Sequence, residues 1–163
     1  MTAEVNEGRR PWGNFDDLHL AALAALLSER GLDLAPREQR GIVSAWHRLA
    51  PWPDVREGLQ ALRRELIIGA LSNGHLALLV DLTRHGDLRF DCLISADLVR
   101  AYKPAADVYR VAPALLGLEP ADIMLVAAHP LDLVAARRSG LRTAFVDGPL
   151  EYGANSPPRR SRR

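Results

Sequence analysis

From residue 66 onward, short apolar runs alternate with stretches of helical periodicity. The apolar runs, which we expect to be strands, cover 66–71, 92–95, 123–127 and 143–146. The helices expected between them cover 75–85, 104–116 and 131–139. Strands that are apolar throughout and alternate with helices indicate right-handed βαβ units and a parallel sheet covered on both faces. The pattern therefore predicts an α/β, Rossmann-like fold.

The segment before this alternation favours helices. Asn14 or Asp16 can cap a first helix, which Gly31 ends. Pro36 opens a second helix, which must stop before Pro51. These two helices predict a hairpin, and residues 1–13 carry no firm element. Three tryptophans precede the expected sheet, and we expect them to pack the hairpin: Trp12, Trp46 and Trp52.

Composition indicates an ordinary globular protein. The 163 residues are 48% hydrophobic and 25% charged, which fits one domain with a sizeable core. We expect a helical cap segment at 1–53 and an α/β core at 54–153 that begins with a third helix. We expect a disordered basic tail at 154–163, where four arginines follow two prolines.

Several classes of function and location are disfavoured. The basic tail has no interleaved aromatic residue and no second basic stripe, so we expect no nucleic-acid partner. No apolar stretch approaches the roughly 20 residues that cross a bilayer, so we expect no membrane partner. A single cysteine, Cys92, and the lack of an apolar N-terminal run favour the cytoplasm.

One basic residue is chemically distinct from all the others. Of the 21 lysine and arginine residues only Lys103 is a lysine. An ammonium group is a compact point charge with three donors, which arginine does not replace. Lys103 follows an expected strand, so its position favours a functional role over chance.

Polar residues collect after three of the expected strands. Ser72 and Asn73 follow the first strand, Lys103 the second, and His129 and Asp132 the third. Ligands of open α/β sheets bind beyond the carboxyl ends of the strands. A hydroxyl and an amide beside free N–H groups at a helix start favour an anion. We therefore expect a small-anion site at this edge.

Each of these residues also has a purely structural interpretation. Ser-Asn-Gly is common in turns, and Asp132 could stabilise a helix dipole. His129 could be a solvated side chain rather than a base. Tyr109, six residues after Lys103, could reach the site or only pack.

Three segments together resemble motifs two, three and four of the haloacid dehalogenase superfamily, in particular the type II (S)-2-haloacid dehalogenases. They are Leu71–His75, Tyr102–Pro104 with Tyr109, and Val126–Arg137. The resemblance extends over 8–153 and includes segments at 10–12, 45–49 and 51–55 that resemble the cap and hinge segments of the family. It implies a hydrolase with a Rossmann-like core.

The resemblance also implies a reaction and residue roles. An aspartate would displace halide from C2 of a small 2-haloacid with inversion, and water would hydrolyse the resulting ester. Ser72 would bind the substrate carboxylate, Asn73 would lie near the halide, and Lys103 would neutralise the aspartate. Asp132 would hold Lys103 and the hydrolytic water, while Tyr109 and His129 would line the pocket: these six are the candidate site residues.

Phosphatases of the same superfamily are the alternative. They bind Mg²⁺ through several acidic residues, because a hard cation needs oxygen ligands. Here the stretch at 127–132 holds only one acid, Asp132. We therefore expect no metal and no cofactor, and we prefer the dehalogenase over a hydrolase of another small anion such as a phosphate ester.

The first motif of the family, Asp-x-x-Gly-Thr at the end of a strand, has no match in this chain. Asp16 and Asp17 stand at a helix start instead. In the family that strand lies between the strands at 66–71 and 123–127, so each would keep an unpaired edge. We expect an N-terminally truncated dehalogenase with impaired activity, low stability and a tendency to form a homodimer, or a non-catalytic remnant that binds a partner.

Overall fold

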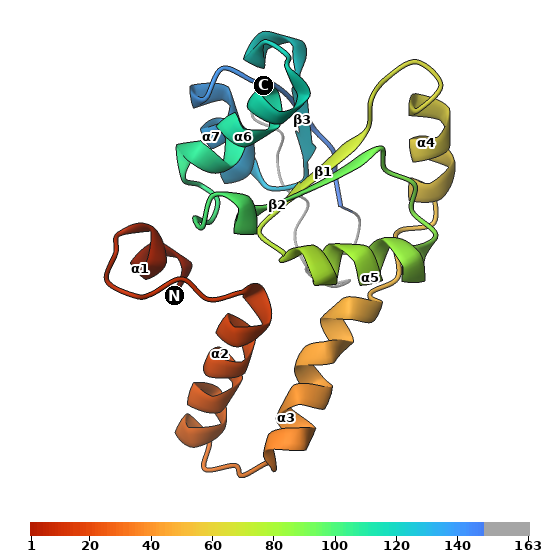
Figure 1. Cartoon of the computed structure of the whole chain (residues 1–163). Helices are drawn as coiled ribbons and strands as arrows, with labels where there is room; N and C mark the ends of the chain where they lie inside the picture. Colours follow the sequence, from red (N-terminus) through yellow and green to blue (C-terminus); the bar gives the residue numbers. More distant parts are fainter. Residues whose placement is uncertain (149–163) are drawn as a thin grey trace.

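The computed structural model describes residues 1–148, so the expected tail at 154–163 lies outside the described residues. Figure 1 shows two parts: a helical hairpin and, above it, an α/β part built from parallel strands and helices. This architecture confirms the expected α/β fold with a preceding helical segment. The expected boundary at residues 53 and 54 stays a prediction.

The hairpin consists of α2 (Phe15–Glu29) and α3 (Pro36–Val43), preceded by the short α1 (Thr2–Asn6). A capping box opens α2: Asn14 Oδ1 accepts from the Asp17 N–H at 2.9 Å, and Asp17 Oδ2 accepts from the Asn14 N–H at 3.3 Å. The second helix was expected to continue towards Pro51, but it ends at Val43 and a 3₁₀ turn, Ser44–Arg48, follows.

The α/β part follows the expected order closely. Helix α4 (Val55–Leu62) leads into β1 (Gly69–Ser72), α5 (Leu76–Gly86) and β2 (Cys92–Ser95). A 3₁₀ turn, Ala96–Leu98, and a loop then lead to α6 (Ala106–Leu116). After the 3₁₀ turn Pro120–Asp122 come the last three elements: β3 (Met124–Ala127), α7 (Pro130–Arg138) and β4 (Arg142–Phe145).

The strands form two small parallel sheets instead of one. β1 pairs with β2, with Gly69 opposite Cys92, and β3 pairs with β4, with Met124 opposite Arg142. Within residues 1–148, β1 and β3 make no ladder with each other. Each therefore has a strand edge without a backbone partner in this part of the chain.

A shared core nonetheless joins the two sheets. Tyr109 of α6 is fully buried and forms a cluster with Ala136 and Leu141. Leu71 of β1 and Leu125 of β3 both pack against this cluster. Apolar contact therefore holds the two half-sheets together where backbone hydrogen bonds do not.

A second cluster connects the N-terminal segment to the α/β part. Tyr102 and Val108 are fully buried there and pack with Val5 of α1 and Leu18 of α2, which are nearly so. Trp12 stacks on Tyr102 with ring centroids 4.6 Å apart. Trp12 therefore packs where the hairpin meets the α/β part, because the same cluster contains Leu18 of α2.

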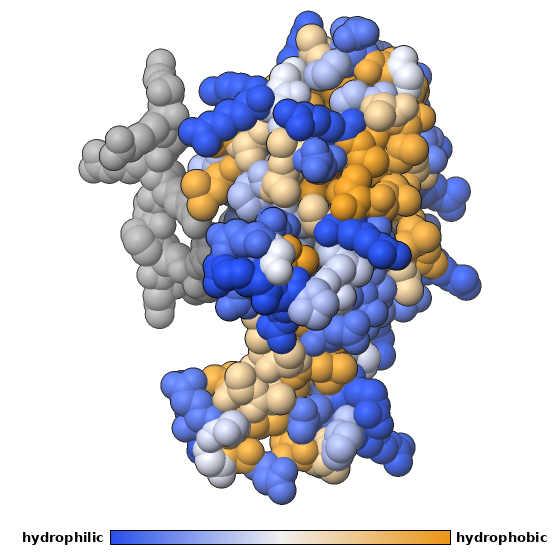
Figure 2. Space-filling view, turned by 60° about the vertical axis from the view of Figure 1, so that its left-hand side comes forward, coloured by the Kyte–Doolittle hydropathy of each residue, from blue (hydrophilic) through white to orange (hydrophobic). Residues whose placement is uncertain are grey.

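The hairpin itself buries little apolar surface. Trp46 stacks on His19 at 4.8 Å, within the helical segment as expected, yet Trp46 keeps 48% of its surface exposed. Figure 2 shows large apolar areas on the surface of the α/β part and smaller ones on the hairpin. In the described part of the chain, no helix has the length and apolar character needed to span a bilayer.

Candidate functional site

An ion pair between Lys103 and Asp132 forms the centre of the candidate site. Lys103 lies in the loop before α6, and Asp132 lies in the first turn of α7. The distance from Lys103 Nζ to Asp132 Oδ2 is 2.9 Å. The side chains are only 15% and 17% exposed, so water screens this pair less than a surface pair. The structure thus brings together two residues that are 29 positions apart.

Tyr109 adds a second hydrogen bond to the same carboxylate. Its hydroxyl donates to Asp132 Oδ1 at 2.6 Å. Burial of the phenol, followed by the hydrogen bond to Asp132 and the charge of Asp132, raises the pKa of Tyr109 well above its usual range. Lys103 Nζ also lies 5.7 Å from the centroid of the Tyr109 ring, within cation–π distance. Tyr109 therefore remains a neutral donor that orients Asp132.

Asn73 links the loop after β1 to the lysine. The backbone N–H of Lys103 donates to Asn73 Oδ1 at 2.7 Å. With its oxygen used in this way, Asn73 can offer its NH₂ group to a ligand. Ser72 Oγ accepts from the Gly74 N–H at 3.0 Å and keeps its own O–H as a donor. Together with the ammonium group, these donors are suited to an anion.

The expectation of free backbone N–H groups beside Ser72 is wrong for two of them. The Gly74 N–H donates to Ser72 Oγ, and the Leu76 N–H at the start of α5 donates to Asp97 Oδ2 at 2.9 Å. The Leu76 N–H needs a side-chain acceptor because the first N–H groups of a helix have no intrahelical acceptor. An anion at this edge would therefore depend on side-chain donors.

His129 lies at the start of the helix that carries Asp132. It is exposed and directly precedes α7, and its carbonyl accepts from the Asp132 N–H at 3.0 Å. This bond belongs to the first turn of the helix. The role of His129 in lining a pocket stays a prediction.

Sequence reasoning missed the residues that support the site. Ser95 is 2% exposed; its hydroxyl donates to the Gly74 carbonyl at 2.9 Å and accepts from the Asp97 N–H at 3.1 Å. Asn6 of α1 holds the backbone of Tyr102 through two hydrogen bonds of 2.8 Å. Ser95 and Asp97 could have been found, because they too follow a strand at its carboxyl end. The sequence contained no comparable signal for Asn6.

The group formed by Lys103, Tyr109 and Asp132 is poorly suited to bind a cation. Asp132 is the carboxylate within ion-pair distance of Lys103 in the described residues, and a phenol donates to its other oxygen. The ammonium group already supplies the positive charge that a metal would supply. The arrangement is better suited to a bound anion than to Mg²⁺, which prefers several oxygen ligands.

Two curated proteins that are similar to this chain are both (S)-2-haloacid dehalogenases. The (S)-2-haloacid dehalogenase of Pseudomonas sp. (strain YL) is 36% identical over 137 residues, which cover 82% of this chain and 59% of the relative. The (S)-2-haloacid dehalogenase of Xanthobacter autotrophicus is 33% identical over 127 residues, 77% of this chain and 50% of the relative. The chain thus spans between half and two thirds of these curated relatives.

Solved structures give the same result for the fold. The L-2-haloacid dehalogenase PA0810 superposes with a TM-score of 0.91 at 46% identity, over 96% of this chain and 67% of that one. The defluorinating L-2-haloacid dehalogenase Rha0230 also reaches 0.91, at 39% identity and with 65% of its chain covered. A family profile described as haloacid dehalogenase-like hydrolase matches residues 1–140. The chain therefore belongs to the haloacid dehalogenase-like hydrolase family.

Proposed function

We propose that this chain carries the substrate-binding and charge-stabilising part of an (S)-2-haloacid dehalogenase. The observation that carries the proposal is the partly buried group formed by Lys103, Tyr109 and Asp132, in which the Lys103 N–H also donates to Asn73. The names of the relatives, (S)-2-haloacid dehalogenase, support the choice of substrate. The substrate would be the anion of a small 2-haloacid.

The proposed reaction has two steps. A carboxylate attacks C2 of the substrate from behind, the carbon–halogen bond breaks, and the halide leaves with the bonding electrons. Water then attacks the carbonyl carbon of the resulting ester, which releases a 2-hydroxy acid and restores the carboxylate. Backside attack inverts the configuration at C2. Both steps concentrate negative charge that preorganised donors can stabilise.

The residues of this chain would bind and stabilise charge. The Ser72 hydroxyl would donate to the substrate carboxylate, and the Asn73 amide would donate to the departing halide. Lys103 would neutralise the attacking carboxylate and its ester. Asp132, oriented by Lys103 and Tyr109, would accept a hydrogen bond from the hydrolytic water.

None of the six candidate site residues is suited to act as the nucleophile. Both oxygens of Asp132 are already used, by Lys103 and by Tyr109. A carboxylate held by an ammonium group and a phenol is a poor nucleophile, because both partners stabilise its ground state. We therefore expect the 163-residue chain by itself to bind 2-haloacid anions and to release halide slowly or not at all.

The expected binding of 2-haloacid anions and the expected slow release of halide are tested by separate measurements. Binding of (S)-2-chloropropionate is measured by isothermal titration calorimetry, and chloride release by ion chromatography. Where no attacking carboxylate is held, the ammonium group of Lys103 would attract the substrate anion instead. Lys103→Met should therefore weaken binding about 10-fold or more, because a hydrogen bond to a charged group is worth about 1.5–3 kcal/mol. Arg110→Met, at an exposed position on α6, is the matched control for the loss of one positive charge.

Two results would contradict the proposal. Equal affinity of the wild type and Lys103→Met for (S)-2-chloropropionate would remove Lys103 from the site. Chloride release at the rate of full-length relatives would contradict the expected impairment. Phosphate release from a small phosphate ester, without halide release, would favour the phosphatase alternative instead.

A further inference from the structure

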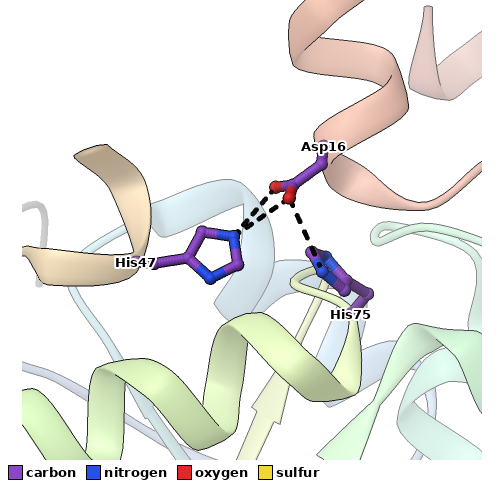
Figure 3. A group of neighbouring side chains, drawn as sticks. All are labelled: Asp16, His47 and His75. Carbon is purple, nitrogen blue, oxygen red and sulfur yellow. Dashed lines mark hydrogen bonds and ion pairs between the residues drawn. The ribbon is translucent and has the colours of Figure 1, made fainter. Parts of the chain in front are cut away.

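Three side chains outside the candidate site converge between the hairpin and the α/β part. Asp16 comes from the first turn of α2, His47 from the 3₁₀ turn after α3, and His75 from the residue before α5 (Figure 3). Asp16 Oδ2 lies 3.0 Å from His47 Nε2 and 3.8 Å from His75 Nε2. One ligand atom of each residue lies within 4.8 Å of the others.

The three groups are largely sheltered from water. The exposed fractions of the side chains are 28% for Asp16, 15% for His47 and 12% for His75. The rings of His47 and His75 meet edge to face, with centroids 5.6 Å apart. Two imidazole nitrogens and a carboxylate oxygen therefore point into one small volume, as Figure 3 shows.

We propose that Asp16, His47 and His75 bind a divalent transition-metal ion, with Zn²⁺ as the best-suited candidate. Zn²⁺ prefers imidazole nitrogen and carboxylate oxygen at about 2.0–2.2 Å in a tetrahedron, which places neighbouring ligand atoms about 3.3 Å apart. The observed separations of 3.0 and 3.8 Å lie on either side of this value. All three ligand atoms lie within 4.8 Å of one another, so side-chain adjustment would have to bring them to the tetrahedral spacing.

The ligand set also selects the class of metal. Mg²⁺ and Ca²⁺ prefer sets of oxygen ligands, whereas two imidazoles and one carboxylate suit Zn²⁺ and its neighbours in the first transition row. Three protein ligands leave the fourth tetrahedral position for water or a small anion. The cluster is distinct from the stretch at 127–132, whose shortage of acids argues against Mg²⁺.

Asp81 of α5 supplies the outer contact that metal-binding histidines commonly have. His47 Nδ1 lies 2.7 Å from Asp81 Oδ2, on the opposite side of the ring from Asp16. A proton on Nδ1 donated to Asp81 leaves the lone pair of Nε2 directed towards the proposed ion. Asp81 is thus a positioning residue that orients the ring and strengthens its basicity.

The proposed ion would tie two parts of the molecule together. Asp16 and His47 belong to the helical segment, whereas His75 follows directly on the loop that contains Ser72 and Asn73. A metal bonded to all three would restrain the hairpin against the start of α5. The inference does not depend on the proposed dehalogenase function, since it concerns other side chains.

Metal binding is tested on the tag-free 163-residue protein. Isothermal titration calorimetry with ZnCl₂ should give one Zn²⁺ per chain, and Co²⁺ should develop the visible d–d bands of tetrahedral coordination. His47→Gln and His75→Gln should each weaken Zn²⁺ binding more than 10-fold and abolish the Co²⁺ bands. His85→Gln, which removes an exposed histidine near the end of helix α5, should change neither readout.

A conservative series separates a metal site from a merely structural cluster. Asp81→Asn should weaken Zn²⁺ binding about 10-fold while the tetrahedral Co²⁺ spectrum remains, as expected for an outer-contact residue. Asp16→Asn should abolish that spectrum. Circular dichroism checks that each variant is folded, and if a histidine variant unfolds, the Asp16 and Asp81 variants decide.

Two outcomes would overturn the inference. The first is the absence of saturable Zn²⁺ binding by the wild type, which would leave His47 as a simple ion-pair partner of Asp16 and Asp81. The second is Zn²⁺ affinity that is unchanged in the folded ligand variants, because the ion would then bind elsewhere.

Discussion

At the scale of single residues, Asp91 joins the end of α4 to the start of β1. Its Oδ1 accepts from Arg63 Nε at 3.0 Å, and its Oδ2 accepts from the Ile68 N–H at 2.9 Å. The hydrogen bond from Arg63, followed by the one from Ile68, lowers the pKa of Asp91 below its ordinary value of 3.8. The folded protein therefore favours the ionised carboxylate.

This lowered pKa predicts a pH dependence of stability. The contribution of Asp91 is fully present above the unfolded pKa of 3.8 and is lost as pH falls through the lower folded value. Asp91→Asn should reduce the melting temperature at pH 7 and make the loss of stability on acidification less steep. Differential scanning fluorimetry from pH 7 to below the folded pKa measures both effects.

A matched variant controls for the loss of one negative charge. Asp107 is an exposed acid on α6 whose partner, Arg110, lies three residues on. Asp107→Asn should leave the melting temperature at pH 7 nearly unchanged, because such surface pairs contribute little. Parallel acid profiles for the wild type and Asp91→Asn would contradict the assigned role of Asp91.

At the scale of elements, the β1–β2 pair depends on a glycine. Gly69 stands opposite Cys92, and a Cβ added at Gly69 would lie 2.8 Å from Cys92 Sγ. Such a separation is too short for a carbon–sulfur contact, so either the side chain or the strand must move. A larger residue at Gly69 would therefore strain the pair.

Gly69→Ala should lower the free energy of unfolding by about 1–3 kcal/mol, the usual cost of overpacking. In the Cys92→Ala background the penalty should be smaller, because the clashing sulfur is gone. Urea denaturation of the four proteins gives the coupling energy directly. Purely additive effects would show that the contact does not cause the loss.

A glycine with open space around its Cα provides a control for the clash at Gly69. Gly58 lies inside α4, and nothing lies within 4 Å of an added Cβ. Gly58→Ala should raise the free energy of unfolding by about 0.4–1 kcal/mol, since alanine restricts the unfolded chain and favours the helix.

At the scale of the whole molecule, the division into two sheets exposes both backbone edges and apolar side chains. Met124 and Val126 alternate along β3 and are 54% and 57% exposed, whereas Leu125 between them packs into the core. An open edge beside exposed apolar residues favours pairing with another strand. We therefore expect the protein to associate as its concentration rises.

Val126→Lys tests this expectation, because a charge on an edge strand opposes strand pairing. Sedimentation equilibrium of the wild type should show an average mass that increases with concentration, and Val126→Lys should reduce that increase. Leu32→Lys, at a 60% exposed position between α2 and α3, should not. A monomer at every concentration, or equal effects of both variants, would contradict the expectation.

The local order of elements could be predicted well from the sequence. The strand at Cys92–Ser95 has its expected bounds, and β3 and α7 lie within one residue of theirs. Apolar runs and helical periods are properties of neighbouring residues, so they are readable without knowledge of distant contacts. The α1 helix was missed because it is only five residues long and carries no apolar period.

Part of the candidate site was readable for a similar reason. The carboxyl ends of parallel strands meet at one edge, so Lys103 and Asp132 could be expected to approach each other. The pattern did not show that the phenol of Tyr109 bonds to Asp132, or that Asp97 occupies the start of α5. Those contacts depend on rotamers and on how helices pack against the strands.

By itself the sequence determined the α/β alternation, the helical segment before it and the chemistry available at the strand ends. Tertiary structure alone decided that the strands pair as two sheets, that Trp12 stacks on Tyr102, and that Asp16, His47 and His75 meet. Periodicity records which face of an element is apolar. It does not record which distant surface covers that face, and this choice follows from packing in three dimensions.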